Sequence, residues 1–342
     1  MNGTLLVKEE LERGQSIMQL ICDELDRLLL GREHLHQLAT IALVSRGHVL
    51  LEGLPGLGKT ALVKALGDIL QMDFKRIQFT PDLMPSDILG SHILQQDDRG
   101  NRNMVFRKGP VFTHILLADE INRASPKTQS ALLEAMQEQT VTLLGETHTL
   151  PDPFFVLASQ NPIEQQGTYP LPEAQMDRFM FKLLVNQPDL ETLADMVNTR
   201  VRGITPPCKQ TVDGTQLVQA FDCVDRVFLS PYVGKYIARL VKESHPQADG
   251  ARLVDKYVSY GASPRALFAL SSGARAHALL NGRPTVGFED VDSVASAALN
   301  HRLVLNYKAG IDQVTATDIV ADLVHSIQPA ELDVPKNVQM KA

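Results

Sequence analysis

At 342 residues the chain is longer than a typical single domain, so we expect two packed units. Hydrophobic residues make up 44% and charged residues 21%, as in ordinary soluble globular proteins. The net charge of −7 argues against general attraction to nucleic acid or to an anionic membrane, although it allows a local basic patch.

The composition also bears on the compartment. No run of 18 apolar residues occurs, so no transmembrane helix is expected, and the N-terminus turns acidic too early for a secretory signal. Cys22, Cys208 and Cys223 are scattered and form no C-x-x-C pair, which favours a reducing compartment and argues against structural zinc. We therefore expect a cytoplasmic protein.

Two helices are expected before the first strand. Apolar residues recur every three or four positions within 1–30, which predicts one amphipathic helix. Gly31-Arg32-Glu33 interrupts this pattern, a second helix follows over 35–43, and Gly47 ends it. By its position, the loop Leu30-Gly31-Arg32 is either a contact for a nucleotide base or a plain helix-ending turn.

The next stretch, Gly53-Leu54-Pro55-Gly56-Leu57-Gly58-Lys59-Thr60, fits the Walker A phosphate loop G-x-x-x-x-G-K-[ST]. An apolar strand over 48–52 precedes it and strong helix formers follow, as a strand–loop–helix phosphate site requires. Lys59 is expected at the β- and γ-phosphates and the Thr60 hydroxyl at Mg²⁺. The residues predicted to contact the nucleotide are Gly53, Pro55, Gly56, Leu57, Gly58, Lys59, Thr60 and Ala61.

Beyond the Walker helix, 74–79 is expected to be a strand. Pro81 and Pro85 preclude one continuous element after it, and Ser86 is a candidate cap for a short helix that begins near Asp87. A polar turn separates possible strands at 91–95 and 104–107, which predicts an exposed hairpin. Its tip is either an inert solvated loop or, in a ring-forming motor, a pore-lining element.

A second chemical signal is the apolar run 113–118 followed by Asp119 and Glu120, the Walker B pattern. Such a strand is buried on both faces and delivers its two acids beside the phosphates. Asp119 is then expected to hold Mg²⁺, often through water, and Glu120 to orient the attacking water.

Further elements follow in order. Ser125-Pro126 is expected to open a helix, and 140–144 with 147–150 to form a hairpin around a type II′ turn at Gly145-Glu146. The buried strand 154–159 brings Asn161 to the same sheet edge as the Walker motifs. By itself Asn161 is better explained as a turn residue before Pro162, and only the order of motifs favours a role beside the phosphates.

Two arginines attract attention in the second half. Pro172 is expected to open a short helix that carries Arg178, where a guanidinium would reach a neighbouring subunit's γ-phosphate or form a salt bridge with Asp177 or Glu173. Ser263-Pro264 opens a later helix with Arg265 in its first turn, pointing either toward phosphate or to solvent.

The remaining chain is almost wholly helical by pattern. A strand over 181–185 is expected to end the α/β unit, and residues after about 327 are expected to form a loose tail. The expected helices are 190–202, 213–223, 231–246, 264–280, 288–298 and 315–326.

This order of motifs resembles AAA+ ATPases, and longer strings are similar to MoxR-family members. The similar strings are Gly47 to Gly53, Gln78 to Asp87, Leu117 to Ala124, and Gln160 to Gln165 with its continuation to Phe179. Gly58 stands where many relatives carry Ala, and Gln166 where many carry an acid.

The resemblance implies an AAA+ P-loop αβα sandwich with a parallel central sheet, followed by an all-α lid domain. It implies an N-terminal helical segment at 1–30, a nucleotide-binding core at 31–187 with a helix-2 insert at about 86–110, a lid at 188–326 and a tail at 327–342. Asn161 would be sensor 1, Arg178 the arginine finger and Arg265 sensor 2.

The resemblance also implies an ATP hydrolase that uses ATP, yields ADP and needs Mg²⁺. Such proteins are expected to form rings, here a hexamer, and to remodel a protein partner, sometimes one with a von Willebrand factor A domain. An alternative is a nucleotide switch or a DNA-stimulated, helicase-like clamp with little hydrolysis, but the charge and the 5% aromatic content do not favour nucleic acid. A small-molecule kinase fits Asn161, Arg178 and the helical lid less well.

Overall fold

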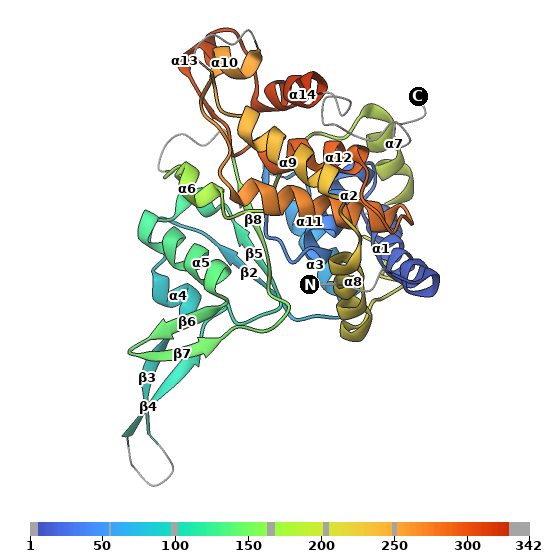
Figure 1. Cartoon of the computed structure of the whole chain (residues 1–342). Coiled ribbons are helices and arrows are strands. Elements are labelled where there is room, and N and C mark those ends of the chain that lie inside the picture. The colour runs from blue at the N-terminus through green and yellow to red at the C-terminus, as the bar shows by residue number, and fades with distance from the viewer. Residues whose placement is uncertain are drawn as a thin grey trace.

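The structure is a computed structural model that describes residues 6–54, 56–96, 102–162, 168–200, 205–247 and 252–327. An α/β unit comes first and a largely helical unit follows, as the sequence predicts (Figure 1). The predicted tail from about 327 lies, except for Ile327, outside the described residues, and so does the tip of the predicted exposed hairpin at 97–101. The domain limits at 30, 187 and 326 stay predictions.

A five-stranded parallel sheet forms the centre of the α/β unit. Its strands lie in the order β2-β5-β8-β1-β9. Their bounds are β1 Val49–Gly53, β2 Phe74–Gln78, β5 Ile115–Asp119, β8 Phe155–Gln160 and β9 Phe181–Val185. Because all five strands run the same way, every loop that follows a strand emerges at one edge of the sheet and every segment that precedes a strand lies at the other.

Alternate residues of the strands feed two separate cores. In β1, Val49 and Leu51 face one apolar cluster, whereas Leu50 faces the other, as the two-residue period of a strand requires. The second cluster lies under α4 (Pro85–Leu89) and α5 (Pro126–Glu138). Burial on both faces explains why the strands are almost continuously apolar.

Helices α2 (Glu33–Val44) and α3 (Lys59–Leu70) contact strands on the other face, and α1 (Lys8–Leu28) packs on these two helices. The apolar positions of α1 that were spaced every three or four residues, including Ile17, Ile21 and Leu25, are buried. The helix packs against α2 and α3 and also against α8 and α11 of the C-terminal part. The first helix is therefore shared between the two parts of the molecule.

All six helices predicted in the C-terminal part are present. They are α7 Leu190–Thr199, α8 Gly214–Arg226, α9 Pro231–Glu243, α11 Arg265–Leu280, α12 Phe288–Leu299 and α14 Ala316–Ser326. The sequence missed the short helices α10 (Leu253–Tyr257) and α13 (Tyr307–Ile311). It also missed a two-stranded sheet of β10 (Val258–Tyr260) and β11 (Val304–Leu305), so the lid is not purely helical.

Two hairpins leave the α/β unit. Strands β3 (Gly90–Gln96) and β4 (Arg102–Lys108) project from the body as an arm, and β6 (Thr140–Leu143) with β7 (Glu146–Thr149) lies beside its base (Figure 1). The predicted type II′ turn at Gly145-Glu146 is wrong. Leu144 and Gly145 both have positive φ, 50° and 85°, which is the pattern of a type I′ turn one residue earlier.

The cap predicted for the short helix after β2 is also displaced. Helix α4 begins at Pro85, and Met84 rather than Ser86 precedes it. The Met84 N–H donates to Asp87 Oδ2 at 2.8 Å, so a carboxylate one turn inside the helix replaces the expected serine hydroxyl.

Two helical glycines provide a matched stability test of how the C-terminal helices pack. A Cβ at Gly273 in α11 would lie 2.8 Å from Cζ of buried Phe181, whereas a Cβ at Gly234 in α9 would meet nothing closer than Leu229 Cδ2 at 3.5 Å. Both Gly→Ala changes gain helix propensity, worth about 1 kcal/mol. We expect Gly234→Ala to stabilise the protein by about 0.5–1 kcal/mol, and Gly273→Ala to destabilise it by about 1–2 kcal/mol through overpacking.

Urea unfolding of the two variants beside the wild type measures both effects. Equal stabilisation by both substitutions would show that α11 can move away from β9 at little cost, and would contradict tight docking of these two elements.

Candidate functional site

The glycine loop joins β1 to α3 at the carboxyl edge of the sheet. Gly56 and Gly58 have φ of 79° and 78°, a region open to glycine, and α3 begins directly afterwards at Lys59. The first N–H groups of that helix and its dipole point into the loop, which makes it suited to an anion. Pro55, predicted to contact nucleotide, lies outside the described residues.

The Lys59 ammonium is held by the protein itself. It is buried, and it donates to the Gly53 carbonyl at 2.6 Å and to the Gln160 carbonyl at 3.5 Å. These contacts hold a positive charge directly over the loop, where it would meet phosphate oxygens.

Both predicted acids lie at the end of β5, beside the loop. Asp119 is only 7% exposed, and its Oδ1 accepts a hydrogen bond from Ser159 Oγ at 2.5 Å. Glu120 has the left-handed φ of 56°, and its N–H donates to the same Ser159 Oγ at 2.9 Å. One serine on β8 thus orients both consecutive acids.

The side chain of Glu120 is fixed as well. Its Oε2 accepts from Gln78 Nε2 at 2.7 Å and from Arg123 Nη1 at 2.8 Å. Two donors on one carboxylate oxygen hold the acid in a single orientation, as a residue that positions a water needs.

A cavity of about 410 Å³ collects these groups. Its lining consists of Gly56, Gly58, Lys59, Thr60, Ala61, Arg76, Gln78, Asp119 and Glu120. The Thr60 hydroxyl and the Asp119 carboxylate supply oxygen donors only, and few of them, which suits Mg²⁺ because that ion keeps water and phosphate oxygens as its other ligands. Within the described ranges, no cluster of three or more His, Cys, Asp or Glu residues able to hold a metal occurs.

A second cavity, of about 500 Å³, adjoins the first at Gly56 and Gly58. Its walls are mostly apolar and come from Leu28, Leu29, Leu30, Pro188, Leu193, Met196 and Val197. Arg32 donates from Nη1 to the Leu57 carbonyl and so ties the loop after α1 to the glycine loop. The loop at 30–32 therefore lies where an apolar slot meets a phosphate site.

Asn161 follows β8 at the same edge and is buried, with its carbonyl accepting from Asn122 Nδ2 at 3.3 Å. Its side chain does not line the 410 Å³ cavity. Its role as a sensor stays a prediction.

The two predicted arginines lie elsewhere. Arg178 and Arg265 share a third cavity, of about 330 Å³, with residues such as Ser45 and Gly47. Residues 45–48 immediately precede β1 and residues 177–180 immediately precede β9, so this cavity lies at the amino edge of the sheet. Five-residue strands span about 16 Å, so neither arginine is placed beside Lys59 of its own chain.

Within this third cavity, Arg178 lies two residues beyond the short helix α6 (Glu173–Met176) and donates to the Leu133 carbonyl at 2.8 Å. The alternative of a salt bridge with Asp177 is not what the structure shows, because Asp177 pairs with Arg265 at 3.2 Å and with Arg302 at 2.9 Å. The hydroxyl of Ser263 donates to Asp177 as well, at 2.7 Å.

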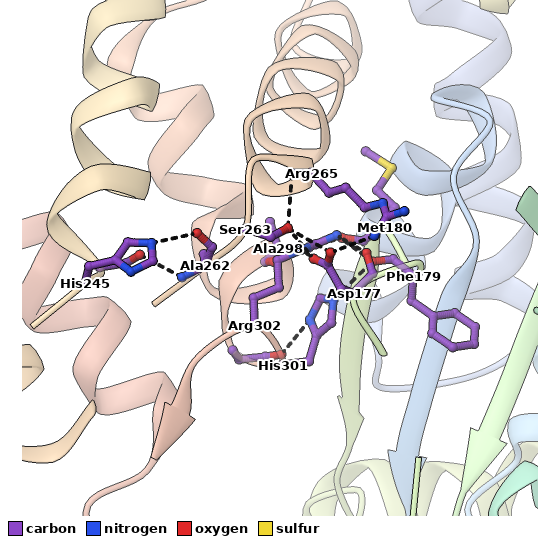
Figure 2. A network of polar contacts seen from close by, with 12 residues as sticks. Asp177, Phe179, Met180, His245, Ala262, Ser263, Arg265, Ala298, His301 and Arg302 are labelled. Atoms are coloured by element: carbon purple, nitrogen blue, oxygen red, sulfur yellow. Dashed lines mark hydrogen bonds and ion pairs between the residues drawn. The ribbon is translucent and has the colours of Figure 1, made fainter. Parts of the chain in front are cut away.

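Arg302 makes five hydrogen bonds, four to the segment around Arg178 and one to α12 (Figure 2). Nε donates to Asp177 Oδ1, and Nη1 and Nη2 donate to the carbonyls of Asp177, Phe179, Met180 and Ala298. Burial would raise the pKa of Asp177, but the bonds from Ser263 and Arg302 and the Arg302 charge hold it below its usual value. An arginine that follows α12 therefore fixes the main chain on both sides of Arg178.

Comparison with known proteins shows the family to which this chain belongs. Residues 48–181 match the model of the ATPase family associated with various cellular activities (AAA), and residues 250–323 match the AAA lid domain. Chaperone MoxR1 of Mycobacterium tuberculosis is 41% identical over 306 residues, which cover 89% of this chain and 80% of that protein. The chain belongs to the MoxR family of AAA+ ATPases.

Two further matches extend over most of the chain. Protein MoxR of Methylorubrum extorquens is 29% identical over 89% of this chain and 91% of its own length. A solved structure from Cytophaga hutchinsonii, described as a candidate ATPase, has a TM-score of 0.84 at 39% identity and covers 94% of this chain and 97% of its own. In the part of the chain that the structure describes, no helix is long and apolar enough to cross a membrane.

Sequence reasoning missed several residues of this MoxR-family site, among them Arg76, Gln78 and Arg302. Arg76 and Gln78 are alternate residues at the end of β2, so the strand period could have placed both on the face that meets the Walker B acids. No local signal marks Arg302, since its partner Asp177 is 125 residues away.

The cavity at the amino edge also generates a pH prediction. His48 is buried there, with Nδ1 accepting from the Val156 N–H at 3.1 Å and Nε2 facing the Met136 carbonyl at 3.2 Å. Burial lowers its pKa to about 4. Since the unfolded chain takes up this proton near pH 6.5, stability is full above that pH and falls as the pH drops toward 4.

Between pH 7 and 4.5 we expect the wild type to lose about 2–3 kcal/mol more than a His48→Gln variant. Urea unfolding over this pH range measures the two slopes. Parallel curves would show that His48 does not stay neutral in the folded protein.

Proposed function

We propose that this MoxR-family protein hydrolyses ATP in a ring of identical subunits and uses the cycle to remodel a protein partner. The observation that carries the proposal is the placement of Arg178 at the sheet edge opposite Lys59. In a single chain, Arg178 therefore cannot reach the phosphate site that contains Lys59. Head-to-tail packing of copies would bring the two together, and such heterologous contacts close into rings.

Within one chain, Lys59 and the first amides of α3 hold the β- and γ-phosphates. Thr60 and Asp119 would hold Mg²⁺, which would neutralise charge on the phosphates. Glu120, fixed by Gln78 and Arg123, orients the water for in-line attack and accepts its proton. The apolar slot beside Leu28 to Leu30 takes the base.

In the ring, Arg178 of one subunit reaches the γ-phosphate of the next and neutralises charge that develops there. Arg265 shares its cavity, at the sheet edge opposite its own chain's phosphate loop, so we assign it to the same neighbouring nucleotide. The contacts of Asp177 with Arg302 and Arg265 hold the segment that carries Arg178 in a fixed position against the lid.

The remodelling role is supported by the relative named chaperone MoxR1 and by the β3–β4 arm. Leu94 and Met104, a cross-strand pair on that arm, are 58% and 59% exposed, which suits transient contact with an unfolded client. A hexameric ring, a partner with a von Willebrand factor A domain and a cytoplasmic location remain parts of this proposal.

We expect Glu120→Gln to bind ATP with near-normal affinity and to hydrolyse it at least about 100-fold more slowly, because the amide cannot accept the proton of the water. Binding of a fluorescent ATP analogue and release of phosphate measure the two properties. Glu134→Gln, a change at an exposed position of α5, is the matched control. Undiminished turnover in Glu120→Gln would remove the acid from the mechanism and favour the nucleotide-switch alternative.

A subunit-mixing assay tests the shared site. Lys59→Ala inactivates a subunit's own site and Arg178→Ala inactivates its neighbour's, so each variant alone should lose about 10³-fold or more in ATPase rate. Mixing the two should restore activity, because some interfaces then pair an intact Lys59 with an intact Arg178. Full activity of Arg178→Ala alone, or no recovery in mixtures that co-assemble, would contradict independently shared sites.

A further inference from the structure

Arg76 occupies the phosphate cavity but has no place in the mechanism above. Its Nη2 and Nε donate to Asp119 Oδ2 at 2.7 and 3.2 Å, and Nη2 also donates to Gln78 Oε1 at 2.8 Å. Arg76 thus binds Asp119, the acid that we propose as a Mg²⁺ ligand.

This contact follows from strand register. Gln78 of β2 pairs with Asp119 of β5, so Arg76, two residues earlier on the same face, is a diagonal neighbour within reach of that carboxylate. Lys75 lies on the opposite face of β2 and donates instead to the Phe112 carbonyl at 3.1 Å. A charge at position 76, and not at 75, is directed into the site.

The contact between Arg76 and Asp119 balances the charge of a buried carboxylate. Asp119 is buried, and a buried carboxylate is costly without a counter-charge. Ser159 engages Oδ1, so Arg76 on Oδ2 is the cation that compensates this acid. Because Ser159 already engages Oδ1, Oδ2 is the oxygen at which Mg²⁺ or its water shell would compete with Arg76.

We propose that Arg76 is a resident counter-ion that Mg²⁺ must displace from Asp119, so that the site accepts the metal only together with a nucleotide. The proposal rests on the nucleotide site proposed above. A free Mg²⁺ ion would have to displace a guanidinium in exchange for one carboxylate oxygen. A Mg²⁺ ion that arrives with nucleotide brings phosphate ligands of its own, and these compensate for the displacement.

Arg76→Gln tests this by removing the charge. We expect the Mg²⁺ concentration at half-maximal binding of a fluorescent ADP analogue to fall about tenfold. This size corresponds to the loss of one charge-assisted hydrogen bond from a half-exposed arginine. Free Mg²⁺ without nucleotide should raise the melting temperature of Arg76→Gln and leave that of the wild type unchanged. Arg76→Lys, which keeps the charge but loses the fork, should lie between them.

Arg123→Gln is the matched control. Arg123 is also a half-exposed arginine at this edge, but it pairs with Glu120 rather than Asp119, so its removal changes the long-range charge and spares the contact. We expect its Mg²⁺ midpoint to stay near that of the wild type.

Two outcomes would overturn the inference: an unchanged or raised Mg²⁺ midpoint in Arg76→Gln, or an equal shift in Arg76→Gln and Arg123→Gln. Either can occur while the nucleotide still binds, which leaves the proposed function standing. If the wild type binds no nucleotide at any Mg²⁺ concentration, the proposed function fails and the counter-ion role fails with it.

Discussion

The common direction of five strands is the constraint on which the rest of this molecule depends. It gathers Gly53, Asp119, Ser159 and Gln78 at one edge, where the strands end, and assigns Arg178 to the other, where β9 begins. Loops can lengthen a side chain's reach by a few ångströms, but they cannot reverse a sheet. The second copy that we propose for the site therefore follows from the direction of the strands rather than from any one contact surface.

The charged side chains of the site are hydrogen-bonded or ion-paired to other groups of the protein. Lys59 rests on the Gly53 and Gln160 carbonyls, Asp119 on Arg76, and Glu120 on Gln78 and Arg123. In the mechanism we propose, the phosphate, the metal and the attacking water would compete for these bonds. Ligand binding would then exchange one set of partners for another and keep the buried charges compensated, which lowers the cost of preorganising them.

The sequence predicted most of the fold and the phosphate edge, because those features follow from short patterns: apolar runs that end in acids, a glycine loop, and caps such as Ser125. It failed where a residue adopts a backbone conformation that its type does not favour, as in the type I′ turn that places Leu144 in the left-handed region. It also failed where two segments meet only after folding. Arg302 and Asp177 are 125 residues apart, and nothing near either predicts that they pair. Arg265 likewise pairs with Asp177, from which it is 88 residues away in the sequence.

The first helix has an implication for motion. Buried residues of α1 pack against α3, the helix that carries Lys59, and against α8 and α11, which belong to the C-terminal part. The fit on the second side is close, since a Cβ at Gly14 would lie 3.0 Å from Cys223 Cβ. A wide hinge opening between the two parts would have to break one of these apolar seams. Small sliding displacements along the axis of α1 would preserve both interfaces. The packing of this helix therefore favours shear motion over hinge motion between the two parts.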